Sequence, residues 1–225
     1  MDKATKKRLK REERARRRAM RKPGVLLKEF WNLPNMLTLG RILIIPIFVW
    51  WTYDADPLYS LLAGLLFTLA AVTDVVDGFL ARRWNLVTVV GKFMDPLADK
   101  LIVTAALVMM VRLGRVAAWV TIILISREFI VSGLRTIAAS EGMVIAAGQE
   151  GKWKTSLQLV GIIALCVHYV HRVDLVFASY DVNFNSVGKV LIYLSTVMSV
   201  WSAALYFRGF LQMLGKRGAG TAQGA

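Results

Sequence analysis

Four aspartates stand close together in an otherwise apolar part of the chain, DVVDGFLARRWNLVTVVGKFMDPLADK: Asp74, Asp77, Asp95 and Asp99. On a helix, the first two project about 60° apart and the last two about 40° apart, so each pair shares one face. The stretch from Arg83 to Val90 is long enough for a second helix to run antiparallel beside the first. The spacing therefore predicts that the two pairs meet in one cluster.

Such a cluster is a candidate metal centre. Four converging carboxylates repel one another and lose hydration unless a positive charge lies between them. Ligands that are all oxygen, with no His or Cys nearby, favour Mg²⁺ or Mn²⁺. Four carboxylates can hold two such ions, an arrangement that clamps a phosphoryl group during displacement. Gly78 and Gly91 allow close approach to the backbone, and Arg82 could meet a phosphate oxygen.

The elements that carry these residues are predicted to be membrane-spanning helices. The chain has 225 residues, of which 56% are hydrophobic, so a soluble domain is a poor explanation. Strands are not expected, because the apolar runs do not alternate and an open sheet edge is not tolerated in lipid. The predicted fold is all-α, with spans at 36–53, 58–82, 92–112, 116–138, 154–171 and 187–207.

Charge predicts the orientation of the chain. Thirteen Lys and Arg fall in the first 28 residues, and the net charge is +14. We expect a basic cytoplasmic tail over 1–24, which binds anionic lipids rather than nucleic acid. An amphipathic interfacial helix follows over 25–34, then the six-helix domain over 35–208 and a flexible tail over 209–225. Both termini and the aspartates should face the cytoplasm, in a multi-pass protein of the cytoplasmic membrane.

The aspartate stretch resembles the signature of the CDP-alcohol phosphatidyltransferases. The pattern D-x2-D-G-x2-A-R-x8-G-x3-D-x3-D is matched without a gap, and it includes Ala81 as well as the residues above. The resemblance implies six transmembrane helices, a homodimer and a cytoplasmic site where an alcohol displaces CMP from a CDP-linked lipid. It also implies that Asp74, Asp77, Asp95 and Asp99 bind two divalent metals, with Asp99 accepting the proton of the attacking hydroxyl.

A second resemblance concerns the nucleotide pocket. Asn35, Thr38 and Arg41 in NLPNMLTLGR recur every three residues on one face, although Asn35 can equally be a helix cap. This segment resembles the start of bacterial phosphatidylglycerolphosphate synthases, where it lines that pocket. With these three residues, the implied contacts to CDP-diacylglycerol are Asp74, Gly78, Ala81, Arg82 and Gly91.

The acceptor is indicated by a cluster of basic residues. Arg127 and Arg135 lie within the fourth span, in SREFIVSGLR, and buried arginines need anions. Glu128 is one possible partner, in a purely structural pairing. The alternative is a pocket for a phosphorylated acceptor that also uses Lys152 and Lys154 of GKWKT. These segments resemble the same synthases, whose acceptor is sn-glycerol 3-phosphate.

Other functions remain open on the sequence alone. Inositol phosphate, serine or phosphatidylglycerol could replace glycerol 3-phosphate in the same chemistry. A metal transporter would use the aspartates as a binding site, but such sites usually lie on broken helices near the bilayer midplane. A non-catalytic membrane scaffold would tolerate the loss of Asp99.

Overall fold

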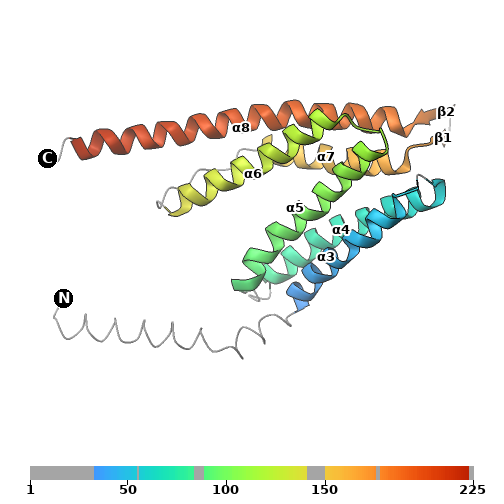
Figure 1. Cartoon of the computed structure of the whole chain (residues 1–225), viewed down its shortest axis with the longest axis horizontal. Coiled ribbons are helices and arrows are strands. Elements are labelled where there is room, and N and C mark those ends of the chain that lie inside the picture. Colours follow the sequence, from blue (N-terminus) through green and yellow to red (C-terminus); the bar gives the residue numbers. More distant parts are fainter. Residues whose placement is uncertain (1–32, 55, 84–88, 141–149, 176–177, 223–225) are drawn as a thin grey trace. The chain divides into compact units, whose positions relative to one another are not determined.

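The computed structural model describes residues 33–54, 56–83, 89–140, 150–175 and 178–222 (Figure 1). The predicted basic tail and almost all of the predicted interfacial helix, 25–34, lie outside these residues. By its contacts the chain divides into two compact units. One comprises Met1–Ile45 and Leu69–Ile102, and the other Pro46–Thr68 and Val103–Ala225. The predicted aspartate site belongs to the first unit, and the predicted acceptor residues belong to the second.

Helices make up most of the described structure. They are α3 (Leu33–Trp51), α4 (Pro57–Arg83), α5 (Val89–Arg112), α6 (Ala118–Ser140), α7 (Glu150–Val167) and α8 (Phe184–Ala222). Each overlaps one of the predicted spans, because long apolar runs satisfy their backbone groups internally as helices. The predominantly helical fold class is therefore confirmed within the described residues.

Side-chain caps help to define where two of the helices begin. The carboxylate of Asp56 accepts hydrogen bonds from the backbone N–H groups of Leu58 (2.9 Å) and Tyr59 (3.1 Å) at the start of α4. The Asn183 side chain accepts one from the N–H of Ser186 (3.2 Å) at the start of α8. Asp and Asn are favoured there because they satisfy N–H groups that have no partner within the helix.

A small β-hairpin joins α7 to α8, which the sequence did not lead us to expect. Strand β1 (Val170–Leu175) pairs antiparallel with β2 (Ala178–Asn183), with Val170 opposite Asn183. The fifth predicted span, 154–171, is correspondingly too long, since α7 ends at Val167. His168 has a φ of 58°, a left-handed conformation that cannot continue a helix.

The C-terminal segment also differs from the prediction. A flexible tail was expected from residue 209, but α8 continues to Ala222. No proline interrupts it, and Phe210 is still buried, so an established helix can propagate through the weaker Gly-containing end. The helix has 39 residues, about 58 Å at 1.5 Å per residue, which exceeds the hydrocarbon thickness of a bilayer.

Membrane character is clearest for two of the helices. Among the described residues, Pro57–Asp74 and Phe184–Met213 are long and apolar enough to cross a membrane, and Asn35–Trp51 and Trp153–Val167 are shorter apolar stretches. Large apolar side chains also point outward: Leu43 is 70% exposed and Trp50 is 73% exposed. A surface of this kind suits lipid rather than water. Six crossings remain a prediction, because α5 and α6 carry charged residues within their length.

Within the second unit, α8 packs along both α6 and α7, as their positions in Figure 1 show. Glycines allow the close approach to α7: a Cβ on Gly188 would lie 2.7 Å from Leu165 Cγ, and one on Gly161 would lie 3.0 Å from Ile192. Small residues at such contacts are typical of membrane helix pairs.

Buried Arg115, in the turn after α5, ties the end of α7 to α4. Its guanidinium donates to the carbonyl of Leu165 (2.8 Å) and to the hydroxyl of Ser60 (3.3 Å). Burial lowers the pKa of Arg115. These bonds satisfy a carbonyl at the C-terminal end of α7 and offset the burial of the charge.

Candidate active site

The first turns of α3 carry three inward-facing polar residues. Asn35, Thr38 and Arg41 are 4%, 1% and 3% exposed, although they lie in a helix whose neighbouring residues Met36, Leu37 and Leu43 are exposed. The spacing of three that the sequence shows therefore places all of them on a buried face. Because α3 begins at Leu33, Asn35 lies inside the helix and is not its N-cap.

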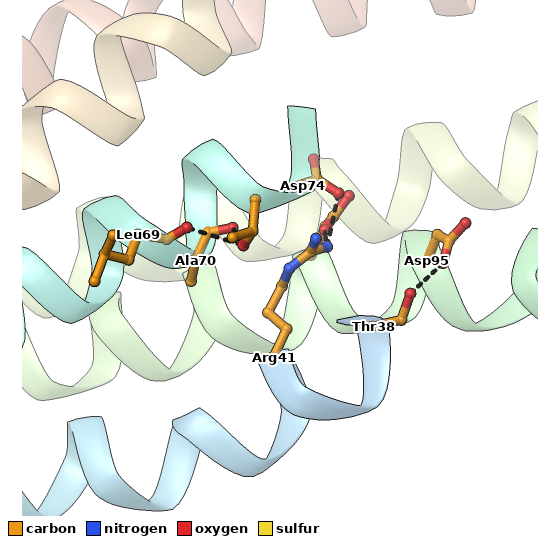
Figure 2. A network of polar contacts seen from close by, with 8 residues as sticks. Thr38, Arg41, Leu69, Ala70, Asp74 and Asp95 are labelled. Atoms are coloured by element: carbon orange, nitrogen blue, oxygen red, sulfur yellow. Dashed lines mark hydrogen bonds and ion pairs between the residues drawn. The ribbon is translucent and has the colours of Figure 1, made fainter. Parts of the chain in front are cut away.

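Arg41 and Thr38 reach the predicted aspartates on α4 and α5, as Figure 2 shows for Asp74 and Asp95. One guanidinium nitrogen of Arg41 donates to Asp74 (2.7 Å) and also to Asp99. The hydroxyl of Thr38 donates to Asp95 (2.6 Å). The structure thus joins Arg41 to Asp74 and Asp99 and joins Thr38 to Asp95, so two residues of the predicted nucleotide pocket contact three of the four predicted carboxylates.

The charges of this cluster are arranged asymmetrically. Arg41 is buried at 3% exposure, whereas the Asp74 and Asp99 side chains are 37% and 44% exposed. A buried guanidinium needs anionic partners, and two carboxylates at close range need a cation between them. Arg41 supplies the cation that the two carboxylates need, and the carboxylates supply the anions that Arg41 needs. The carboxylates also remain accessible to a ligand from outside.

The donor set fits a hard divalent cation in its chemistry. Asp74, Asp95 and Asp99 offer only oxygen atoms, and each carboxylate has more lone-pair positions than the contacts above use. Among the described side chains, no three acidic, His or Cys residues are grouped as ligands of one ion. Asp77, the remaining predicted ligand, lies in α4 with a side chain outside the described set.

Other predicted residues around the aspartates are placed only by their backbone. Gly78, Ala81 and Arg82 belong to the last turns of α4, and their side chains are outside the described set. Gly91 is buried near the start of α5. The motif therefore lies where predicted, at the end of one helix and the start of the next.

A second polar cluster links α6, α7 and α8 in the other unit. Arg127 Nη1 and Lys154 Nζ both donate to Glu128 Oε2, at 3.0 Å and 2.6 Å. The Arg127 and Lys154 side chains are 10% and 6% exposed, and that of Glu128 is 41% exposed. The structural alternative raised by the sequence, pairing of Arg127 with Glu128, is therefore present.

Helix α8 supplies contacts that the sequence-based prediction missed. Arg127 donates from Nε to the carbonyl of Ser199 (3.1 Å) and from Nη2 to the hydroxyl of Ser202 (3.3 Å). The Ser195 hydroxyl donates to the backbone carbonyl of Lys154 (2.9 Å). The recurrence of serine at 195, 199 and 202 has helical spacing and could have identified this face.

The other two predicted acceptor residues are less closely defined. The guanidinium carbon of Arg135, on α6, lies 6.0 Å from the centre of the Tyr206 ring on α8. Lys152 lies in the first turn of α7, and its side chain is outside the described set. The structure thus connects Arg127 with Lys154 through Glu128 and places Arg135 beside Tyr206.

Comparison with known proteins identifies relatives over most of this length. The family model for CDP-alcohol phosphatidyltransferase matches residues 31–201. A Bacillus subtilis protein named CDP-diacylglycerol–glycerol-3-phosphate 3-phosphatidyltransferase is 42% identical over 183 residues, covering 76% of this chain and 92% of that protein. A Rickettsia bellii protein of the same name is 34% identical over 177 residues, covering 79% of this chain and 94% of that protein. An Arabidopsis thaliana protein, named CDP-diacylglycerol–glycerol-3-phosphate 3-phosphatidyltransferase 2, is 34% identical over 219 residues. The match covers 87% of this chain and 86% of that protein.

Proposed function

This chain belongs to the CDP-alcohol phosphatidyltransferase family, and from that premise we propose that it transfers a phosphatidyl group from CDP-diacylglycerol to sn-glycerol 3-phosphate. The products are phosphatidylglycerol phosphate and CMP. The choice of acceptor is carried by one observation: relatives of up to 42% identity, matched over nearly their whole length, are named for that acceptor. As a member of this family the chain is a transferase, which excludes the transporter and scaffold alternatives.

The proposed reaction is a displacement at the phosphorus of the diphosphate that carries the lipid. The acceptor hydroxyl forms a new P–O bond, the P–O bond to CMP breaks, and CMP leaves with the electron pair of that bond. We assign the proton of the hydroxyl to the carboxylate of Asp99, which is 44% exposed and can therefore meet a substrate.

Two divalent ions, Mg²⁺ or Mn²⁺, are proposed to be held by Asp74, Asp77, Asp95 and Asp99. When bound, they would supply positive charge beside the diphosphate and the departing CMP. The oxygen-only donors of Asp74, Asp95 and Asp99 support this assignment, as does the general dependence of the family on divalent metal. Thr38 orients one of these ligands by donating to Asp95.

The nucleotide end of CDP-diacylglycerol is assigned to the buried face of α3 and the motif on α4 and α5. The set is Asn35, Thr38, Arg41, Asp74, Gly78, Ala81, Arg82 and Gly91. Arg41 supports this assignment because its guanidinium is already held at the aspartates, where it can also neutralise phosphate oxygens.

The acceptor phosphate is assigned to Arg127, Arg135, Lys152 and Lys154. Arg127 and Lys154 share one carboxylate, that of Glu128, so within the described part of the chain two buried cations are matched by a single anion. This excess of positive charge supports a phosphorylated acceptor over serine or a neutral diol. Glu128 then has a positioning role, since it holds both cations in place.

The proposal extends to the setting of the enzyme. We place it in the cytoplasmic membrane as a homodimer, with six membrane-spanning helices and both termini in the cytoplasm. The basic residues of the N-terminal tail would bind anionic lipids there. The exposed apolar side chains of the helices support residence in a membrane.

A CMP-release assay tests this function. Purified full-length protein with CDP-diacylglycerol, Mg²⁺ or Mn²⁺ and glycerol 3-phosphate should release CMP and form phosphatidylglycerol phosphate. Chelation by EDTA should stop the reaction, and added Mg²⁺ or Mn²⁺ should restore it. Release of CMP only with inositol phosphate, serine or phosphatidylglycerol would reassign the acceptor, and release that survives EDTA would contradict the metal site.

A further inference from the structure

Helix α8 carries a line of hydroxyl side chains on its inner face. Ser195, Ser199, Ser202 and Tyr206 follow one another at steps of four, three and four residues, which keeps them within about 60° around the helix. Ser195 and Ser199 are fully buried, and Tyr206 is 9% exposed. This hydroxyl stripe faces α6 and α7, as its contacts with Arg127 and Lys154 establish.

Two members of the hydroxyl stripe have hydrogen-bond partners, and two have none among the residues that the structure describes. Ser195 donates to the carbonyl of Lys154, and Ser202 accepts from Arg127. The hydroxyls of Ser199 and Tyr206 are buried, and neither has a hydrogen-bond partner within the described part of the chain. A buried hydroxyl without a partner is unfavourable, above all in a membrane protein. A group from outside the chain would satisfy both.

The charges beside these hydroxyls indicate what that group is. Arg127 approaches Ser199 at its carbonyl, and the Arg135 guanidinium lies beside the Tyr206 ring. Glu128 is the one carboxylate found in contact with Arg127 and Lys154 among the described residues. The surroundings of the stripe are therefore positive overall, which favours an anion with several oxygen atoms over a water molecule or a neutral alcohol.

The separation of the two hydroxyls suits a small phosphorylated molecule. Ser199 and Tyr206 are seven positions apart, about 10 Å along the helix axis. An extended three-carbon phosphate with a hydrogen bond at each end can bridge this distance. Serine and tyrosine hydroxyls both donate and accept, so they can contact a phosphate oxygen or an alcohol group, whereas the arginines contact only acceptors.

We propose that Ser199 and Tyr206 of α8 bind the phosphorylated acceptor directly and contribute to the choice of that acceptor. The inference rests on the proposed function, and it adds two neutral residues from the last helix to the cationic residues of α6 and α7. The cations recognise the phosphate charge, and the hydroxyls recognise the shape and length of the alcohol that carries it.

The test removes one hydroxyl at a time and leaves the rest of the side chain in place. For Tyr206→Phe and for Ser199→Ala in the full-length enzyme, we expect the KM for glycerol 3-phosphate to rise about ten-fold or more. The KM for CDP-diacylglycerol should stay within about two-fold of the wild-type value, because a hydroxyl that touches only the acceptor adds nothing to donor binding.

Tyr193→Phe is the matched control. Tyr193 lies on the same helix, but it is 41% exposed, and the centre of its ring lies 5.9 Å from the centre of the Trp119 ring. The same loss of a hydroxyl there should leave both KM values unchanged. Stabilisation of the protein against thermal unfolding by glycerol 3-phosphate, without CDP-diacylglycerol, gives a second readout that does not depend on turnover, and both stripe variants should weaken it.

Unchanged acceptor KM values in both stripe variants would overturn the inference, because the hydroxyls would then make no contact with the acceptor. Equal increases in both KM values, or a lower unfolding temperature with acceptor binding intact, would also overturn it in favour of a packing role. If the wild-type enzyme uses a different acceptor, the proposed function fails separately. The same variants measured with that other acceptor then decide the role of the hydroxyl stripe.

Discussion

Arg41 connects the two parts of the predicted site at the level of single residues. The sequence places it six residues beyond Asn35 in an apolar helix, and the structure shows its guanidinium between Asp74 and Asp99. A buried cation held at carboxylates in this way keeps a positive charge where a diphosphate would bind. The residue that first indicated a nucleotide pocket is therefore also a partner of the proposed metal ligands.

Replacement of Asp99 by asparagine should abolish turnover. The amide would keep the size of the side chain but could not take a proton, so CMP release should fall by about 100-fold or more. The measurement is CMP release at saturating substrates, together with the unfolding temperature in detergent, which should not fall.

Asp56→Asn is the control for this change. It makes the same substitution at a residue that caps α4, where asparagine serves equally well. Wild-type rates in that variant and lost activity in Asp99→Asn are expected together. Full activity in Asp99→Asn would exclude Asp99 as the base.

Thr38 is predicted to act through Asp95. Thr38→Val removes the hydroxyl that donates to Asp95 at 2.6 Å and keeps the volume of the side chain. We expect the Mg²⁺ concentration for half-maximal activity to rise about ten-fold or more, since groups that orient metal ligands have effects of that size. Titration of CMP release with Mg²⁺ measures it.

Two further variants check this interpretation. Thr38→Ser keeps the hydroxyl and should restore the wild-type titration. Thr68→Val removes a hydroxyl whose bond among the described residues stays within α4, to the carbonyl of Gly64 at 2.7 Å, and should change nothing. If Thr38→Val and Thr68→Val gave the same titration, Thr38 would have no role in metal binding.

Packing between whole helices sets the position of the polar cluster formed by Arg127, Glu128 and Lys154. Helix α8 contacts α7 through Gly161 and Gly188, and it contacts α6 through Arg127. These approaches hold the serines of α8 against Arg127 and Lys154. The glycines therefore act on the site through the distance between helices and touch none of the site residues in the contacts described.

Gly188→Ala should destabilise the protein. The added methyl would lie 2.7 Å from Leu165 Cγ and 2.9 Å from the Leu165 backbone nitrogen, so one of the helices must shift. Overpacking of this kind costs about 1–3 kcal/mol, which thermal unfolding in detergent would detect as a lower transition temperature.

The control for this prediction lies on the same helix. Around Gly209, nothing stands within 4 Å of an added Cβ, and alanine is the better helix former. Gly209→Ala should leave the unfolding temperature unchanged or raise it. Equal effects of the two substitutions would show that the α7–α8 contact is not tight at Gly188.

At the scale of the molecule, apolar surface and charge distribution together predict the topology. Two described helices meet the length and composition expected of a span, and basic residues crowd the N-terminal tail. Six crossings would place the β-hairpin between α7 and α8 on the side opposite both termini.

Cysteine labelling tests that arrangement. In a Cys166→Ala background, Asp181→Cys in the hairpin should react with a membrane-impermeant maleimide in right-side-out vesicles, because Asp181 is exposed. Arg208→Cys on α8 should react only after the vesicles are opened, since the proposed topology places this position towards the cytoplasm. Labelling of both from the same side would contradict a crossing of the membrane between the two positions.

Much of this protein could be predicted from its sequence because the relevant signals are local. Long apolar runs predict helices, since only internal hydrogen bonding is stable in lipid. The spacing of Asp74, Asp77, Asp95 and Asp99 predicts two paired carboxylates, because a helix turns by about 100° per residue. These signals correctly predicted the six described helices and the family, and they led to the proposed reaction.

The tertiary structure decided which distant residues meet. Thr38 and Asp95 are 57 positions apart, and Arg127 and Ser199 are 72 apart, so no local period relates them. It also decided the left-handed turn at His168 and the hairpin that follows. Helical periodicity specifies which face a residue occupies but not which helix lies opposite that face. That pairing depends on close packing at positions such as Gly188, where side-chain volume determines how near two helices can come.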